Sequence, residues 1–443
     1  MAQLAGLPYT KLRFDGTGRR LGAAGPVAPA GVSDLVVISH GWHQDADDAE
    51  AMYAAILKHL QVEAAATHLL DGRTLGVVGV YWPSDKFRPD LTLETAPDIP
   101  PGAGAGTALA GGRADISPAE LRELAGSVAR LLGLAEDGFG DLAIQARHGA
   151  GNADALVEAL RSRLPKPEEV DELTCDEHER LLRRDVPGRV LFADVQSGGS
   201  SGGGTALSGE AGFGDLGASQ APAVNILGGP FAVVAKLLNQ AAYFELKRRA
   251  GVVGESLADL VDADGLPGVQ RLHLVGHSFG ARLVTAAASR MQTARPHSLT
   301  LLQGAFSHNG LGVGIPRGDR PIDGTFRNVV AEKKAGRVVI THTWNDHAVG
   351  LAYALASRAG NTVASGLMKV TDRFGGAKDL HGGIGANGAL RLKDGEGRAW
   401  TFDGASVPGL EAGRVHSLRC DFIGGHSDIR TAGVARLVLA AMV

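Results

Sequence analysis

The chain of 443 residues has little of several features that mark specialised classes of protein. Its two cysteines, Cys175 and Cys420, lie too far apart for a disulfide framework, and neither has a second cysteine nearby to form a metal pair. Aromatic residues make up only 5%, which argues against a base-stacking surface. The formal net charge of −4 gives no attraction to nucleic acid or to anionic membranes. We therefore expect no nucleic-acid partner.

Long apolar segments and nucleotide-binding loops are missing as well. No window holds 18 uninterrupted apolar residues, so we expect no transmembrane helix. The N-terminus lacks a basic head followed by an apolar run, so we expect no secretory signal and a cytoplasmic location, with signal-less export left open. No Gly-Lys dipeptide occurs, which excludes a P-loop, and we expect no cofactor. No oligomeric state follows from these features.

Short apolar runs bounded by turn residues are what the chain has instead. They indicate buried parallel strands at 35–39, 75–81, 272–275, 299–303, 338–341 and 415–423. Patterns of helical spacing separate them at 45–60, 231–249, 281–291 and 431–442. This alternation predicts an α/β fold, a mostly parallel sheet flanked by helices.

A stretch of about 140 residues interrupts this alternation. It opens with a Pro/Gly/Ala-rich segment, carries helical patterns near 117–134, 152–164 and 167–184, and closes with a Gly/Ser run at 197–204. We interpret residues 85–224 as a mainly helical cap or lid, inserted between the core segments 1–84 and 225–443. A second irregular, Gly-rich stretch at 361–413 has room for a small hairpin.

The strongest chemical signal is Gly276-His277-Ser278-Phe279-Gly280, between a predicted strand and a predicted helix. A serine hydroxyl becomes a useful nucleophile only when it is held exposed and a base removes its proton. A tight strand-to-helix turn presents Ser278 in this way, and the glycines let the neighbouring backbone pass closely. The spacing predicts that Ser278 is a nucleophile, although an ordinary serine in a glycine-rich turn is the alternative.

With this motif the core resembles the α/β-hydrolase family, whose nucleophile, acid and base follow in the order Ser, Asp or Glu, His. The resemblance covers about 35–84 and 231–443 but not the insert. It implies that Asp346, just after the strand at 338–341, is the acid. It implies that His426, after the last strand, is the base. Asp323 is the alternative for the acid and His416 for the base, and Asp428 is a candidate cap of the last helix.

The segment His40-Gly41-Trp42 resembles the oxyanion loop of the same family. By this resemblance the backbone N–H groups of Trp42 and Phe279 stabilise the oxyanion of an acyl-transfer intermediate. We take His40, Gly41 and His277 as candidates for the substrate pocket. The alternative for the two aromatic side chains is ordinary packing.

The resemblance implies a serine hydrolase that cleaves carboxylic esters through an acyl-enzyme, with apolar, lipid-like or polyester-like substrates. An amidase, thioesterase or peptidase using the same triad, and an inactive binding protein of the same fold, remain alternatives. The segment His342-Thr-Trp344-Asn-Asp346-His347 echoes a binuclear zinc signature, but Trp344 stands where one imidazole ligand is needed. We therefore expect no metal site.

Overall fold

The computed structural model describes residues 2–42, 44–84, 116–166, 181–192, 231–316, 320–346, 348–349, 376–378 and 380–443. The chain divides into two compact units. The first comprises Met1–Lys86, Leu246–Tyr353 and Phe374–Val443, and the second comprises Phe87–Glu245 and Ala354–Arg373. Each unit is described by itself.

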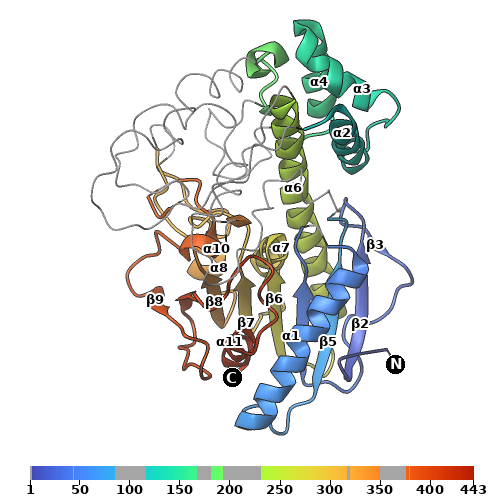
Figure 1. Cartoon of the computed structure of the whole chain (residues 1–443). Helices are drawn as coiled ribbons and strands as arrows, with labels where there is room; N and C mark the ends of the chain where they lie inside the picture. Colours follow the sequence, from blue (N-terminus) through green and yellow to red (C-terminus); the bar gives the residue numbers. More distant parts are fainter. Residues whose placement is uncertain are drawn as a thin grey trace. The chain divides into compact units, whose positions relative to one another are not determined.

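The first unit is built on one sheet, whose strands are seen in Figure 1. They are β1 (Gln3–Leu4), β2 (Leu7–Phe14), β3 (Arg20–Leu21), β4 (Asp34–Ser39), β5 (Leu75–Tyr81), β6 (Arg271–His277), β7 (Ser298–Leu302), β8 (Arg337–His342), β9 (Gly397–Thr401) and β10 (Val415–Arg419). Among the described residues the order is β1-β2-β5-β4-β6-β7-β8-β10-β9, with β3 paired to β2. Every pairing from β2 to β9 is parallel, while β1 and β3 run antiparallel to β2. The predicted mostly parallel sheet is thus confirmed.

Strand β4 lies at the centre, and all six of its residues are buried. The chain passes from β4 through helix α1 (Ala46–Thr67) to β5 on one side, and β6 later pairs with the other side. In an open α/β sheet, such a reversal of strand order leaves a crevice at the carboxyl ends of the diverging strands. The fold therefore favours a site where β4 and β6 end.

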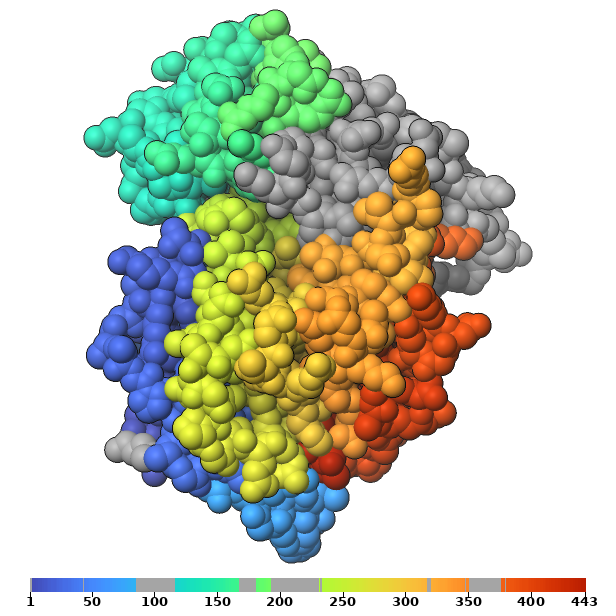
Figure 2. All heavy atoms as spheres, turned by 180° about the vertical axis from the view of Figure 1, so that it is seen from behind, coloured from blue at the N-terminus to red at the C-terminus, as the bar shows by residue number. Residues whose placement is uncertain are grey.

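Helices cover both faces of this sheet. Figure 1 shows α1 and α11 (Ala432–Met442) on the near face, where Met52 and Leu437 join one buried apolar core. Figure 2, seen from behind, shows yellow-green residues of α6 (Ala232–Asp264), whose part from Leu246 onward belongs to this unit. This part of α6 packs against α7 (Phe279–Arg290) so closely that a Cβ on Gly254 would come within 2.3 Å of the Leu283 carbonyl oxygen.

Several elements differ from the sequence-based expectation. Strands β1, β2 and β3 were not predicted, because charged Lys11 and Arg13 alternate with the buried residues of β2. In place of a hairpin between 361 and 413, the described part of that stretch contains β9, which pairs parallel to β10. Helix α6 does not end at 249 but continues to Asp264.

The second unit contains helices α2 (Pro118–Leu132), α3 (Phe139–Gln145), η3 (Ala146–His148) and α4 (Ala150–Arg161), and it includes α6 as far as Glu245. Ser117 and Glu120 cap α2 reciprocally, and Leu121, Leu124 and Val128 form its buried face. The helices expected near 117–134 and 152–164 are present, while the pattern at 167–184 lies mostly outside the described residues. The sequence predicted an insert bounded by breaks after 84 and 224, and the structure divides the chain after Lys86 and after Glu245. The role of this unit as a cap stays a prediction.

Candidate active site

Ser278 lies in a strained turn between β6 and α7, with φ 56° and ψ −123°. Residues other than glycine rarely adopt a positive φ, so surrounding contacts must hold it in place. The Ser278 N–H donates to the Leu302 carbonyl at 3.1 Å, and the Ser278 carbonyl accepts from Ala281 and Ala305, each at 3.0 Å. These bonds fix the side chain at the carboxyl end of β6.

Three glycines allow the backbone around this turn to approach closely. A Cβ on Gly276 would come within 2.3 Å of the Gly280 carbonyl oxygen, and a Cβ on Gly280 would come within 2.4 Å of the carbonyl oxygens of Ser39 and His40. A Cβ on Gly41 would lie 2.5 Å from the Ser278 Cβ and 3.0 Å from its Oγ. Real Cβ atoms do not approach so closely, so only glycine fits at these positions. The loop after β4 therefore lies directly against the serine.

His40 holds that loop from behind. Its Nδ1–H donates to the Gly41 carbonyl at 2.9 Å, and its Nε2 accepts from the Trp82 N–H at 3.3 Å. The His40 N–H donates to the Tyr53 hydroxyl at 2.8 Å, and burial lowers the pKa of the imidazole to about 4. Because a trans peptide is planar, fixing the Gly41 carbonyl also sets the direction of the Trp42 N–H. His40 is thus a structural residue of the loop.

Asp346 and His426 come together from positions 80 residues apart. His426 Nδ1 donates to Asp346 Oδ2 at 2.8 Å; the carboxylate is fully buried, and the imidazole side chain is 17% exposed. A carboxylate only accepts hydrogen bonds, so Nδ1 carries a proton, and when the imidazole is neutral its Nε2 has the lone pair. Asn345 ties the two loops, because its Nδ2 donates to the Ile423 and Asp421 carbonyls at 3.0 Å each.

The surroundings of Asp346 keep its carboxyl ionised. Burial by itself raises the pKa, but the charge and Nδ1–H of His426, the Val349 N–H and the Gln303 amide together lower it below its ordinary value. Val349 donates to Oδ1 at 3.0 Å and Gln303 Nε2 to Oδ2 at 3.1 Å. Sequence reasoning missed Gln303; its one signal was a polar residue at the carboxyl end of an apolar run.

His277 joins the loop of His426 to the turn of Ser278. Its Nε2–H donates to the His426 carbonyl at 2.9 Å, and the two rings lie 4.8 Å apart. Burial, reinforced by the charge of His426 when that imidazole is protonated, lowers the pKa of His277 to about 3, so the His277 imidazole is neutral. Because His277 directly precedes Ser278, this bond brings the loop of His426 to the end of β6. Contact with a substrate stays a prediction for His277, His40 and Gly41.

The alternative residues lie elsewhere. Asp323 is exposed and accepts from the Gly314 N–H at 3.3 Å. His416 is buried on β10, where its Nε2–H donates to the Glu411 carbonyl at 2.9 Å. Asp428 does not cap α11, because Thr431 has that role; it accepts from the Gly424 N–H at 2.9 Å and closes the turn around His426.

The expected oxyanion donors, Trp42 and Phe279, lie at this edge of the sheet. Phe279 is the first residue of α7, where the positive end of the helix dipole is found. The two aromatic rings meet edge to face at 6.2 Å. Packing accounts for these side chains, whereas the part expected for the two backbone N–H groups stays a prediction.

The structure gives the zinc-like segment a different role. Asp346 bonds to His426, while burial lowers the pKa of His342 to about 4 and His347 lies outside the described residues. Within the described part of the chain, no group of three or more His, Cys, Asp or Glu side chains is arranged to hold a metal ion.

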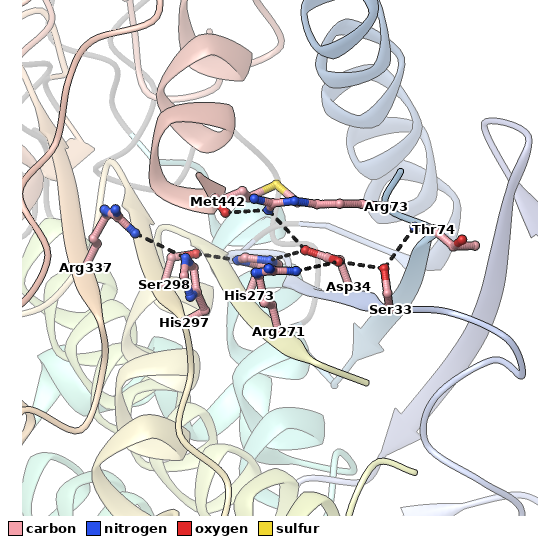
Figure 3. Close-up of polar contacts among 10 residues, drawn as sticks. All are labelled: Ser33, Asp34, Arg73, Thr74, Arg271, His273, His297, Ser298, Arg337 and Met442. Carbon is pink, nitrogen blue, oxygen red and sulfur yellow. Dashed lines mark hydrogen bonds and ion pairs between the residues drawn. The ribbon is translucent and has the colours of Figure 1, made fainter. Parts of the chain in front are cut away.

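A second Ser–His–Asp array lies at the opposite, amino-terminal edge of the sheet (Figure 3). His273 connects Ser298 Oγ, 2.9 Å from its Nδ1, to Asp34 Oδ1, 3.3 Å from its Nε2. Asp34 also contacts Arg73 at 3.3 Å and Arg271 at 3.5 Å. Burial raises the pKa of Asp34, but bonds from His273 and Ser33 and the nearby positive charges lower it to about 2.

Backbone geometry and position separate the two arrays, whereas burial does not. Ser278 and Ser298 are each 1% exposed. However, Ser298 lies in regular strand β7, paired with His273 and Arg337, and has no strained turn. Asp34 is also shared with two guanidinium groups, which weakens its hold on an imidazolium. We therefore interpret the amino-terminal array as structural.

Comparisons of the chain with protein-family models, curated proteins and solved structures found no match. Within the described residues, no helix combines the length and the apolar character needed to cross a bilayer. Function is therefore inferred from the geometry of the site.

Proposed function

We propose that the chain is a serine hydrolase of the α/β-hydrolase fold, with Ser278 as nucleophile, His426 as base and Asp346 as orienting acid. The observation that carries this proposal is the 2.8 Å bond between the buried Asp346 carboxylate and His426, whose loop is tied by His277 to the strained Ser278 turn. The position of Ser278 at the carboxyl end of β6, next to the end of β4, supports this proposal, because open α/β sheets bind ligands at such a reversal of strand order.

The proposed reaction has two halves. His426 Nε2 takes the proton of Ser278 Oγ as this oxygen bonds to the substrate carbonyl carbon, and the carbonyl oxygen becomes an oxyanion facing the Trp42 and Phe279 N–H groups. The carbon–oxygen bond to the alcohol then breaks, and the alcohol leaves with the proton from His426. Water repeats the sequence on the acyl-serine and releases the acid. Asp346 stabilises the imidazolium in both halves.

Carboxylic esters are the proposed substrates. An alcohol leaves with less help from an acid than an amine does, so a single His–Asp pair serves an ester well. The aromatic side chains of Trp42 and Phe279 beside the nucleophile favour an apolar, lipid-like or polyester-like ester.

Labelling with a fluorophosphonate, read by intact mass, tests the nucleophile. We expect one adduct on the wild type and none on Ser278→Ala, because the probe bonds only to an activated hydroxyl. Ser298→Ala is the matched control, since it makes the same change in the other Ser–His–Asp array; it should label like the wild type. An adduct on folded Ser278→Ala, or none on folded wild type, contradicts the proposal.

A further inference from the structure

Gln303 is a fully buried glutamine beside the proposed acid. It directly follows β7 and has φ 46°, a backbone conformation unusual for a residue with a side chain. Its N–H donates to Thr341 Oγ1 at 3.0 Å, which connects the strained residue to the adjacent strand β8. Strain of this kind persists only where surrounding contacts hold it, so the position of Gln303 is strongly determined.

The neighbours of the Gln303 side chain fix which way its amide points. Nε2 donates to Asp346 Oδ2 at 3.1 Å and to the Gly385 carbonyl at 3.3 Å, and both of these oxygens only accept. Thr341 Oγ1 donates to Gln303 Oε1 at 2.8 Å. Both N–H bonds and the carbonyl oxygen are therefore used, and a flipped amide would place its oxygen against the two oxygens that only accept.

The Gln303 amide and the His426 imidazole donate to the same oxygen of the Asp346 carboxylate. Asp346 Oδ2 accepts from His426 Nδ1 at 2.8 Å and from Gln303 Nε2 at 3.1 Å, while Oδ1 accepts from the Val349 N–H at 3.0 Å. The torsion that turns an aspartate carboxylate is soft, so donors around it decide the plane of the group. The plane in turn decides where the imidazole of His426 points.

We propose that Gln303, oriented by Thr341, is a positioning residue for catalysis that sets the plane and charge of the Asp346 carboxylate. This inference rests on the proposed function, because it assigns Asp346 and His426 their catalytic roles. The alternative is a buried amide that merely satisfies its own hydrogen bonds. The positioning role and this alternative differ in one respect: only the positioning role predicts that a change at Gln303 alters the pH dependence of labelling at Ser278.

Gln303→Met tests the role with little change in side-chain length, because methionine has no donor for Asp346. The rate of fluorophosphonate labelling should fall about tenfold or more, the size expected when a bond to a charged group is lost. The acid side of the pH–rate curve should move to higher pH, because the full charge of Oδ2 then faces His426 and holds its imidazolium more tightly. Circular dichroism and the thermal midpoint report the fold.

Thr341→Val keeps the test open if Gln303→Met fails to fold. It removes the hydroxyl that orients the amide, so the same shift should occur with a smaller loss of rate. Thr300→Val is the matched control, because Thr300 is a fully buried threonine on β7 whose hydroxyl has no hydrogen-bond partner. We expect its rate and pH curve to equal those of the wild type.

Two results overturn the inference: an unchanged rate and pH curve in Gln303→Met or Thr341→Val, or a loss that is equal at every pH and follows the folded fraction. The wild type separates this failure from that of the proposed function. A wild type that does not label contradicts the hydrolase itself, whereas a wild type that labels at Ser278, with variants that behave identically, contradicts only the role of Gln303.

Discussion

Asp346 receives three hydrogen bonds and donates none. The donors are His426 Nδ1, Gln303 Nε2 and the Val349 N–H. An asparagine at this position would turn its amide N–H groups toward at least one of these donors. If the nitrogen takes the place of Oδ1, it faces Val349 and His426 keeps its acceptor, so some orienting function survives.

Asp346→Asn should therefore lower the labelling rate by about 10²–10⁴-fold, less than the loss in Ser278→Ala. The measurement is the second-order labelling rate at pH 7. Asp323→Asn makes the same exchange at an exposed carboxylate and should label normally. Full activity in Asp346→Asn together with a loss in Asp323→Asn would exchange the two assignments.

At the scale of elements, the start of α7 meets the end of β4 through a bare backbone contact. A Cβ on Gly280 would lie 2.4 Å from the carbonyl oxygens of Ser39 and His40, which are backbone atoms and cannot rotate away. Gly280→Ala should push α7 from β4 and lower the free energy of unfolding by about 1–3 kcal/mol or more, with labelling lost. Urea unfolding and the probe measure both effects.

Gly251 gives the control for this contact. It lies inside α6, and a Cβ there would be 3.7 Å from the nearest atom, in the Arg282 side chain. Gly251→Ala should be neutral or stabilising by up to about 1 kcal/mol, since alanine favours helix. If both variants behaved alike, the close approach of Gly280 to β4 would not limit the stability of the fold.

Buried and half-buried histidines make the stability of the fold depend on pH. Burial is the main cause that lowers the pKa of His40, His297 and His342 to about 4 and that of His277 to about 3. The unfolded chain binds these protons near pH 6.5 and the folded chain does not, so stability falls as the pH drops from 6.5 toward 4. Asp34 acts in a lower window, because its pKa of about 2 stabilises the fold above pH 3.8 and this contribution is lost toward pH 2.

We expect the free energy of unfolding to fall steeply between pH 7 and pH 4, with His40 alone contributing on the order of 3 kcal/mol. Urea titrations at several pH values measure this dependence. A His342→Gln variant, which removes one of the groups, should show a shallower slope. A flat profile between pH 7 and pH 4 would contradict the linkage.

The features that could be predicted from the sequence are those whose signals lie in neighbouring residues. The turn at Ser278 was predicted from the strand–turn–helix pattern of neighbouring residues, and the strands before and after it, β6 and β7, were predicted from their apolar runs. The local signal of Gln303 is weak, because its proposed role depends on contacts with Thr341 and Asp346 on another strand and loop. The helix predicted at 231–249 continues as α6 to Asp264, and the added part contains Gly254, whose close contact with Leu283 depends on the three-dimensional packing and has no local pattern.

The central place of β4 has a consequence for synthesis of the protein. One edge of this buried strand pairs with β5 soon after it is made, but the other waits for β6, which begins at Arg271, whereas β5 ends at Tyr81. At about 5–20 residues per second, a ribosome needs roughly 10–40 s to make the intervening chain. During this time an apolar strand edge is open to pairing with other chains, so the nascent protein is exposed to aggregation until β6 is made.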